Sequence, residues 1–148
     1  MKEILAQIYR NKIFMTTISA WLIAQGIKVF IGVIYQRKFD FRWFIGTGGM
    51  PSSHAAGASC LAAAMGLEYG FSSPYFALAA AFAIVVMFDA QGVRRATGKQ
   101  ARILNKITED IYWKGKVPEG RLKELVGHTP VEVIAGFAIG VMIAFIAK

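Results

Sequence analysis

Two short motifs in this chain place a histidine at the start of an apolar segment. The first is the run GGMPSSH at residues 48–54, which supplies two glycines, two hydroxyls and the imidazole of His54. The second is the run GHTPVE at residues 127–132, which contains His128 and Glu132. Free backbone N–H groups at a helix N-terminus favour anions, so both motifs suit a phosphate ester or phosphoanhydride. Glu132 lies four residues after His128, one helical turn away on the same face, where a carboxylate could orient the imidazole.

The chain is too apolar for an ordinary soluble domain of its size. It has 148 residues, of which 55% are hydrophobic, and a mean hydropathy of +0.46. Four apolar segments cover residues 13–35, 55–71, 75–89 and 131–147. The first and last approach or exceed the roughly 20 residues that cross a bilayer, whereas the second and third are nearer the short end and need protein neighbours. Residues 72–74 carry no charge and predict a tight turn, which makes segments two and three a helical hairpin.

These segments predict an all-α fold with one domain over residues 1–148. The predicted fold is an integral membrane bundle of about four transmembrane helices plus an interfacial amphipathic helix. Residues 1–12 predict a short amphipathic or interfacial helix. The third loop predicts another at the membrane surface, because apolar residues near helical spacing accompany a basic face. The apolar residues are Val93, Leu104, Ile107 and Ile111, and the basic ones are Arg95, Lys99, Arg102 and Lys106.

The net charge of +8 is unevenly distributed. The loop after the first segment holds three basic residues and the third loop holds nine, against Lys2, Arg10, Lys12 and Lys148 on the other side. If all four segments cross, the positive-inside rule places the motif-bearing side in the cytoplasm of a bacterial-type plasma membrane. Most of these cations are expected to contact anionic lipid headgroups. Nucleic acid is not an expected partner, because no stacking aromatic residues alternate with the basic ones.

Two charged residues lie within or at the end of apolar segments. Lys28 is inside the first, with Gln25 almost one turn earlier, and Asp89 closes the third. Charged groups at membrane depth usually face a bundle interior, which makes both functional candidates. Lys28 could instead snorkel to the interface, and Asp89 could pair with a nearby arginine. With one cysteine, Cys60, and two histidines, no thiol cluster, zinc site or other cofactor is expected.

The two histidine motifs resemble those of the type-2 phosphatidic acid phosphatases, membrane enzymes related to vanadium haloperoxidases. The run PSSH at residues 51–54 is similar to the family's P-S-G-H, and the run from His128 to Gly136 is similar to H-x-P-x-D-V-x-x-G. Serine replaces a glycine at Ser53 and glutamate replaces an aspartate at Glu132.

The resemblance covers roughly residues 28–140 and departs from the family at two further motifs. Leu122 stands where the family has an arginine, so Arg94 or Arg95 is the better counterpart. Lys28 could supply the lysine of the family's first motif, although Tyr35 follows where Arg-Pro is expected. The chain therefore resembles a divergent branch of that superfamily.

This resemblance implies a hydrolase that acts on a phospholipid or isoprenoid phosphate or pyrophosphate without a metal. His128 would attack phosphorus, Glu132 would hold its tautomer and His54 would protonate the departing oxygen. The phosphate would be bound by Ser52 and Ser53 with adjoining N–H groups, and by Lys28 and Arg94 or Arg95. Gly49 and Asp89 would support the site. The two histidines, Ser52 and at least one of the two arginines are then expected to converge on one cavity.

Three alternatives to a working phosphatase remain open from the sequence. The chain could bind or translocate a lipid phosphate without turnover. It could be a scaffold that assembles through Gly136-x-x-x-Gly140 and the small residues near Gly57 and Ala62. For the phosphatase as for the alternatives, a homodimer is expected, because four short helices leave only a thin wall around a cavity. Finally, Ser52 or Ser53 could only cap a helix, with both histidines merely interfacial.

Overall fold

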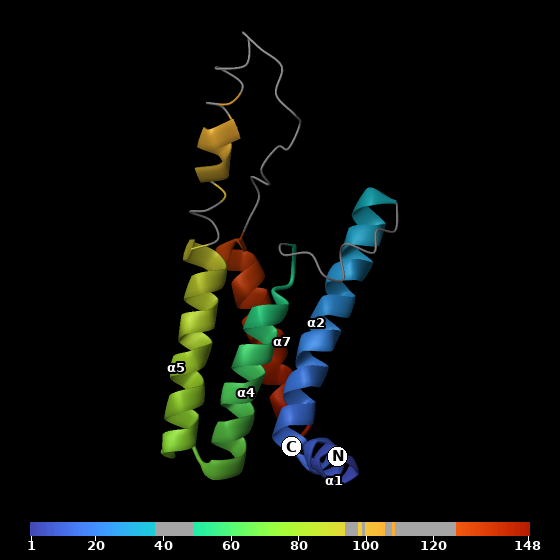
Figure 1. Ribbon diagram of the computed structural model, residues 1–148, viewed down its shortest axis with the longest axis vertical. Coiled ribbons are helices and arrows are strands. Elements are labelled where there is room, and N and C mark those ends of the chain that lie inside the picture. The colour runs from blue at the N-terminus through green and yellow to red at the C-terminus, as the bar shows by residue number, and fades with distance from the viewer. Residues whose placement is uncertain (38–48, 94–97, 99, 106–107, 109–126) are drawn as a thin grey trace.

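The structure is a computed structural model that describes residues 1–37, 49–93, 98, 100–105, 108 and 127–148. Its described elements are all helical, which confirms the predicted all-α class (Figure 1). They are α1 (Lys2–Arg10), α2 (Lys12–Gln36), α4 (Ser53–Tyr69), α5 (Pro74–Phe88), the π-helix η1 (Asp89–Val93) and α7 (Pro130–Ile146). Residues 100–105 are also helical and include Leu104, half of which is exposed. Ile107 and Ile111, also expected on that amphipathic helix, lie outside the described residues.

Polar residues fix where the long helices begin. Asn11, Ser52, Ser73 and Thr129 each accept a hydrogen bond from the backbone N–H three residues later, at 3.0–3.3 Å. Such N-caps satisfy one of the N–H groups that a helix start leaves unbonded. α4 ends at Tyr69 with Gly70 as its C-cap, whose φ of +88° suits glycine, and α5 starts four residues after that cap. The predicted hairpin of segments two and three is therefore confirmed.

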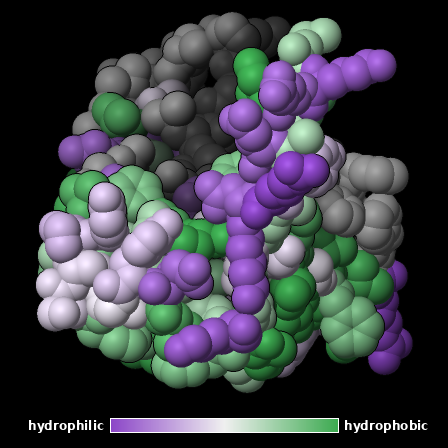
Figure 2. Space-filling view, turned by 90° about the horizontal axis from the view of Figure 1, so that it is seen from below, coloured by the Kyte–Doolittle hydropathy of each residue, from purple (hydrophilic) through white to green (hydrophobic). Residues whose placement is uncertain are grey.

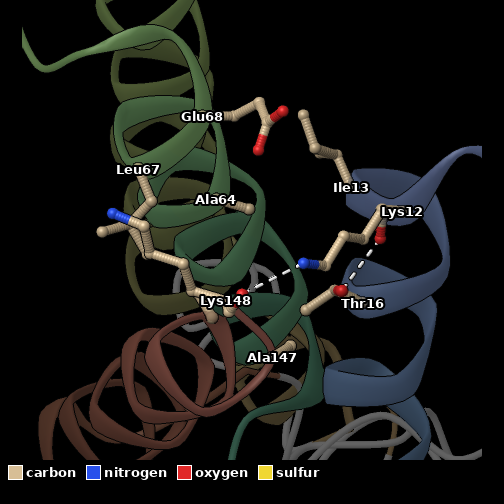
Figure 3. A pocket seen from close by; sticks show the side chains of 9 residues that line it. Lys12, Ile13, Thr16, Ala64, Leu67, Glu68, Ala147 and Lys148 are labelled. Carbon is tan, nitrogen blue, oxygen red and sulfur yellow. Dashed lines mark hydrogen bonds between the residues drawn. The ribbon is translucent and has the colours of Figure 1, made fainter.

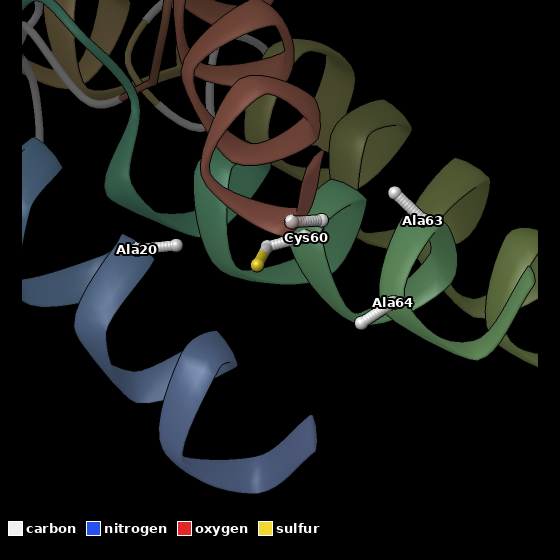
Figure 4. Packing of buried hydrophobic residues seen from close by; sticks show 5 residues of the cluster. Ala20, Cys60, Ala63 and Ala64 are labelled. Atoms are coloured by element: carbon white, nitrogen blue, oxygen red, sulfur yellow. The ribbon is translucent and has the colours of Figure 1, made fainter. Parts of the chain in front are cut away.

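α4 is the central helix, and α2, α5 and α7 pack around it. Eleven of its 17 residues are buried, and all eleven are Ala, Gly, Ser or Cys. Figure 4 shows one cluster, in which Cys60, Ala63 and Ala64 of α4 lie near Ala20 of α2. A helix covered on several sides at short interaxial distance has room only for small side chains, so its composition reflects burial rather than contact with lipid.

Two glycines of α7 allow the closest approach in the bundle. A Cβ atom at Gly136 would overlap the carbonyl oxygen of Ser52, and one at Gly140 would overlap that of Ala56. The Ser59 hydroxyl also donates to the Phe137 carbonyl across this contact, at 3.1 Å. The Gly136-x-x-x-Gly140 stripe therefore packs α7 against α4 within one chain, which leaves it unavailable as the outer assembly surface considered above.

Within the part of the chain that the structure describes, two helices are long and apolar enough to cross a membrane, residues Lys12–Tyr35 and Pro74–Gly92. The expectation that the third segment is short is wrong, because η1 continues α5 without a break and brings the span to 19 residues. α7 is apolar but has 17 residues. Large apolar side chains, such as Phe30 on α2 and Phe82 on α5, remain exposed on the outer faces. These faces suit lipid, as expected of a membrane bundle.

Candidate functional site

Both histidine motifs lie at one end of the bundle, where α2 and α5 end and α4 and α7 begin (Figure 1). Two backbone hydrogen bonds join the segments there. The N–H of Ser52 donates to the carbonyl of Glu132 at 3.0 Å, and the N–H of His128 donates to the carbonyl of Ala90 at 2.9 Å. The first motif, the second motif and η1 are therefore held together by main-chain bonds that do not depend on side-chain identity.

His128 is 2% exposed, and its Nδ1 lies 3.0 Å from Oε2 of Glu132. The same oxygen accepts the N–H of Thr129 at 3.1 Å, while the Thr129 hydroxyl accepts the N–H of Glu132. This is a capping box at the start of α7. The expected contact between Glu132 and the His128 imidazole is confirmed, but His128 lies before the N-cap of α7 rather than on the helix, and the Glu132 side chain reaches back to the imidazole. With a carboxylate at Nδ1, the favoured neutral tautomer carries its proton there and its lone pair on Nε2.

His54 is the second residue of α4, and its ring lies near that of His128. The two ring centroids are 6.2 Å apart with the planes tilted by 55°. Ring centroids of contacting aromatic side chains lie about 4.5–7 Å apart, so this separation is that of a ring contact. The fold therefore brings the two imidazoles together at one place, although they are far apart in the sequence.

Ser52 and Ser53 are both buried, at 0% and 2% exposure. The Ser52 hydroxyl accepts the N–H of Ala55 at 3.3 Å, so the capping role considered above is present. Accepting this bond leaves the hydroxyl hydrogen available for donation, because a hydroxyl is donor and acceptor at once. Ser53 opens α4, where the first N–H groups point out of the helix. Capping by Ser52 and anion binding at this turn are chemically compatible.

Lys28 belongs to the same cluster and does not snorkel to the surface. Its side chain is 7% exposed, and Nζ donates to Oε1 of Gln25 at 3.1 Å. The stem passes Gly49, where an added Cβ would lie 3.4 Å from Cγ of Lys28. The Lys28 ammonium also interacts electrostatically with the Glu132 carboxylate. Gly49, with φ of +87°, thus combines a backbone conformation and a close approach that a larger residue would disturb.

Three further residues were predicted to belong to the site, and the structure describes one of them, Asp89. Asp89 starts η1, next to the carbonyl of Ala90 that binds His128. Arg94 and Arg95 lie outside the described residues, so their place in the site stays a prediction. Among the described residues, no group of three or more His, Cys, Asp or Glu side chains could hold a metal ion.

Sequence reasoning missed the roles of Thr129 and of the Ala90 carbonyl, and it did not include Gln25 in the site. Thr129 was detectable, because Thr-x-x-Glu before an apolar run is the signature of a capping box. The bond from His128 to Ala90 had no sequence signal, since it joins main-chain groups 38 positions apart through the tertiary fold.

Comparison with known proteins gives two matches. Residues 9–143 match the sequence model of a family described as the divergent PAP2 family. The chain is also 38% identical over 151 aligned positions to the uncharacterized membrane protein YuiD of Bacillus subtilis (strain 168), covering 95% of this chain and 96% of that protein. No solved structure matches the chain significantly.

Proposed function

Because this chain belongs to the divergent PAP2 family, we propose that it is a membrane phosphatase that hydrolyses a lipid phosphate or lipid pyrophosphate through a phosphohistidine intermediate. The observation that carries the proposal is the buried His128–Glu132 pair whose imidazole lies 6.2 Å, centroid to centroid, from that of His54. If the His128–Glu132 pair only stabilised the fold, it would not need the His54 imidazole beside it.

In the proposed first step, Nε2 of His128 attacks phosphorus while the bond from phosphorus to the lipid oxygen breaks. His54, protonated, gives its proton to the leaving lipid oxygen, and Glu132 stabilises the positive charge that develops on His128. In the second step, His54 removes a proton from water as the water oxygen attacks the phosphohistidine. Inorganic phosphate leaves, and His128 and His54 return to their starting states.

The remaining residues bind the charge of the transferring group. Lys28 supplies a buried cation, and the Ser52 hydroxyl and the first N–H groups of α4 supply donors to the equatorial oxygens. Arg94 or Arg95 is proposed as a further cation, following the end of η1. A lipid phosphate suits this end of a membrane bundle, because its headgroup can enter from water while its tail stays in the bilayer.

A non-catalytic lipid-phosphate binding or translocating protein is the second candidate. The observation in its favour is that Ser53 is buried at the position where related phosphatases carry glycine. The same donors and the same lysine would then hold the headgroup without transfer. This hypothesis predicts saturable binding of a lipid phosphate and no release of inorganic phosphate.

Three finer points belong to the proposal. The site faces the cytoplasm of a multi-pass protein in a bacterial-type plasma membrane, which the twelve basic residues of the two adjoining loops support. The protein forms a homodimer, which light scattering of the protein–detergent complex would test. It needs no metal, so activity should survive treatment with a chelator.

Phosphate release by the purified protein, across a panel of lipid phosphates and pyrophosphates in detergent, tests the enzyme against the binding protein. Release that is lost in His128→Ala, with the thermal midpoint retained, supports the phosphatase. A second measurement uses vanadate, which mimics the transferring group and should raise the thermal midpoint through native-state binding. A vanadate shift unchanged in His128→Ala would contradict the assigned site.

A further inference from the structure

The end of the bundle remote from the histidines has a surface chemistry of its own. α2 and α5 begin there, α4 and α7 end there, and α1 lies beside them near both chain ends (Figure 1). Seen from below, this end shows hydrophilic groups set among hydrophobic ones (Figure 2). None of these groups takes part in the phosphate site.

α1 is strongly amphipathic and packs against little of the described structure. Its apolar residues recur at helical spacing and are exposed: Ile4 by 62%, Leu5 by 51%, Ile8 by 42% and Tyr9 by 70%. No residue of α1 is buried. Its polar residues are Lys2, Glu3, Gln7 and Arg10. An apolar stripe without a protein partner among the described residues needs an apolar environment from elsewhere.

The turn between α4 and α5 brings exposed aromatic residues to the same end. Tyr69, Phe71 and Tyr75 are exposed by 53%, 57% and 58%. Tyr69 and Tyr75 contact each other with ring centroids 5.1 Å apart. Tyrosine has an apolar ring and a polar tip, and for that reason it is enriched where hydrocarbon meets water.

The charge at this end favours anions. Four basic residues, Lys2, Arg10, Lys12 and Lys148, stand against Glu3 and Glu68. Lys12 donates from Nζ to the carbonyl of Lys148 at 3.2 Å across a shallow pocket that Thr16 and Glu68 also line (Figure 3). The pocket is small and carries both signs of charge, so the surface around it, rather than the pocket, is the recognition feature.

We infer that this surface docks on the lipid headgroups of the membrane leaflet opposite the histidines, with α1 lying in the interface and favouring anionic phospholipid. Two observations select lipid as the occupant. Asn11 is the C-cap of α1 and the N-cap of α2, so α1 leads directly into a helix that is long and apolar enough to span a membrane. The basic residues on and beside α1 complement anionic headgroups.

Helix length places the two surfaces on opposite sides of the bilayer. α2 runs from the α1 end of the bundle to the histidine end over 25 residues, which is about 37 Å at about 1.5 Å per residue. A hydrocarbon core is about 30 Å thick, so a helix of this length reaches both interfaces. The inference concerns lipid docking alone and stands whether or not the site at the other end hydrolyses phosphate.

The test uses an environment-sensitive fluorophore on single cysteines in the Cys60→Ala protein. The label is attached at Ile8→Cys on the apolar face or, as the matched control, at Gln7→Cys on the polar face, in phosphatidylcholine vesicles with or without phosphatidylglycerol. We expect blue-shifted emission and protection from aqueous iodide at position 8 only. Quenching at position 8 by spin-labelled phosphatidylglycerol should exceed that by spin-labelled phosphatidylcholine.

The charge contribution is tested by Lys2→Gln with Arg10→Gln, and by Glu3→Gln as the opposite control. Each basic residue near an anionic surface contributes on the order of a fivefold preference. The double variant should lose the phosphatidylglycerol preference but keep the blue shift, while Glu3→Gln should strengthen the preference. Equal exposure of positions 7 and 8 would overturn the docking. A blue shift that vanishes when the protein is diluted in lipid would assign the face to a second copy of the chain and also overturn it.

Discussion

At the residue scale, the orientation of the His128 imidazole depends on a carboxylate that also caps a helix. The Glu132 carboxylate caps the first turn of α7 by accepting the N–H of Thr129, and the same oxygen binds Nδ1 of His128. A side chain fixed by a helix start has little freedom to move away from the imidazole. Positioning of the proposed nucleophile and stability of the helix terminus are therefore coupled at one atom.

His54→Ala tests the proposed acid through the leaving group. An alkyl lipid alkoxide needs a proton as it departs, so its release should fall by about 10²–10⁴-fold. An aryl phosphate leaves without that proton in the first step, so its phosphoryl transfer, measured as the burst of phenolate, should fall far less. An equal loss with both substrates would contradict the acid role. Unchanged vanadate stabilisation would serve as the control for the fold.

Gln25→Leu tests whether Gln25 positions Lys28. The side-chain amide oxygen of Gln25 accepts a hydrogen bond from the buried Lys28 ammonium, and removal of a buried partner of a charged group costs about 1–3 kcal/mol. Vanadate affinity should therefore fall, by about 5- to 150-fold for a loss of this size, as measured by the concentration dependence of the thermal shift. Gln25→Asn keeps an amide acceptor without adding charge and should retain more of the affinity than Gln25→Leu. Equal affinity in Gln25→Leu and the unaltered protein would show that Lys28 needs no such partner.

At the element scale, the close packing of α4 against α7 depends on small residues in both helices. α4 is built from small residues because three helices cover it, and α7 brings glycines to the points of closest backbone approach. The contact at Gly136 lies directly against Ser52, the cap of α4 and a residue of the phosphate site. Helix packing and the geometry of the site therefore share this contact.

Gly136→Ala and Gly26→Ala make a matched pair for this contact. A Cβ at Gly136 would overlap the Ser52 carbonyl, whereas one at Gly26 in α2 meets nothing within 4 Å. Overpacking should cost Gly136→Ala about 1–3 kcal/mol. Helix propensity should stabilise Gly26→Ala by up to about 1 kcal/mol. Thermal midpoints in detergent should move in opposite directions, and a similar shift in both would show that the close approach is not needed.

At the scale of the whole molecule, the two ends of the bundle differ in chemistry. One end carries the histidines, the buried lysine and the helix starts of α4 and α7. The other carries α1 and the aromatic turn. An even number of crossings between the two motif-bearing loops would keep both histidines on one side of the membrane, as the contact between their rings requires.

Single-cysteine labelling tests the orientation of the whole chain. Cysteines at Lys38, Ser73 and Lys116 in the Cys60→Ala protein are exposed to an impermeant reagent in intact cells. Positions 38 and 116 should behave alike, protected inside the cell, and position 73 should react from outside, because the basic loops favour the cytoplasm. Reaction of positions 38 and 116 from outside would reverse the orientation. Opposite behaviour of these two positions would contradict the shared face.

The sequence by itself determined the helical class, the hairpin and the family resemblance, because each depends on local pattern. Runs of apolar residues, the uncharged turn at residues 72–74, and the order of the two histidine motifs can all be recognised along the chain. Lys28 could be singled out as a charge within an apolar run, but its surroundings could not. The periodicity of a helix does not indicate which residues of other helices lie next to Lys28.

Only the tertiary structure decided which groups meet. The bond from Ser52 to Glu132, the bond from His128 to Ala90, and the approach of Gly49 to Lys28 each join residues distant in sequence. The expected pairing of His128 and Glu132 is present, but the capping box brings it about, since His128 lies before the N-cap and outside the helix. Local chemistry is encoded at each position, whereas the distance between positions depends on how the helices pack.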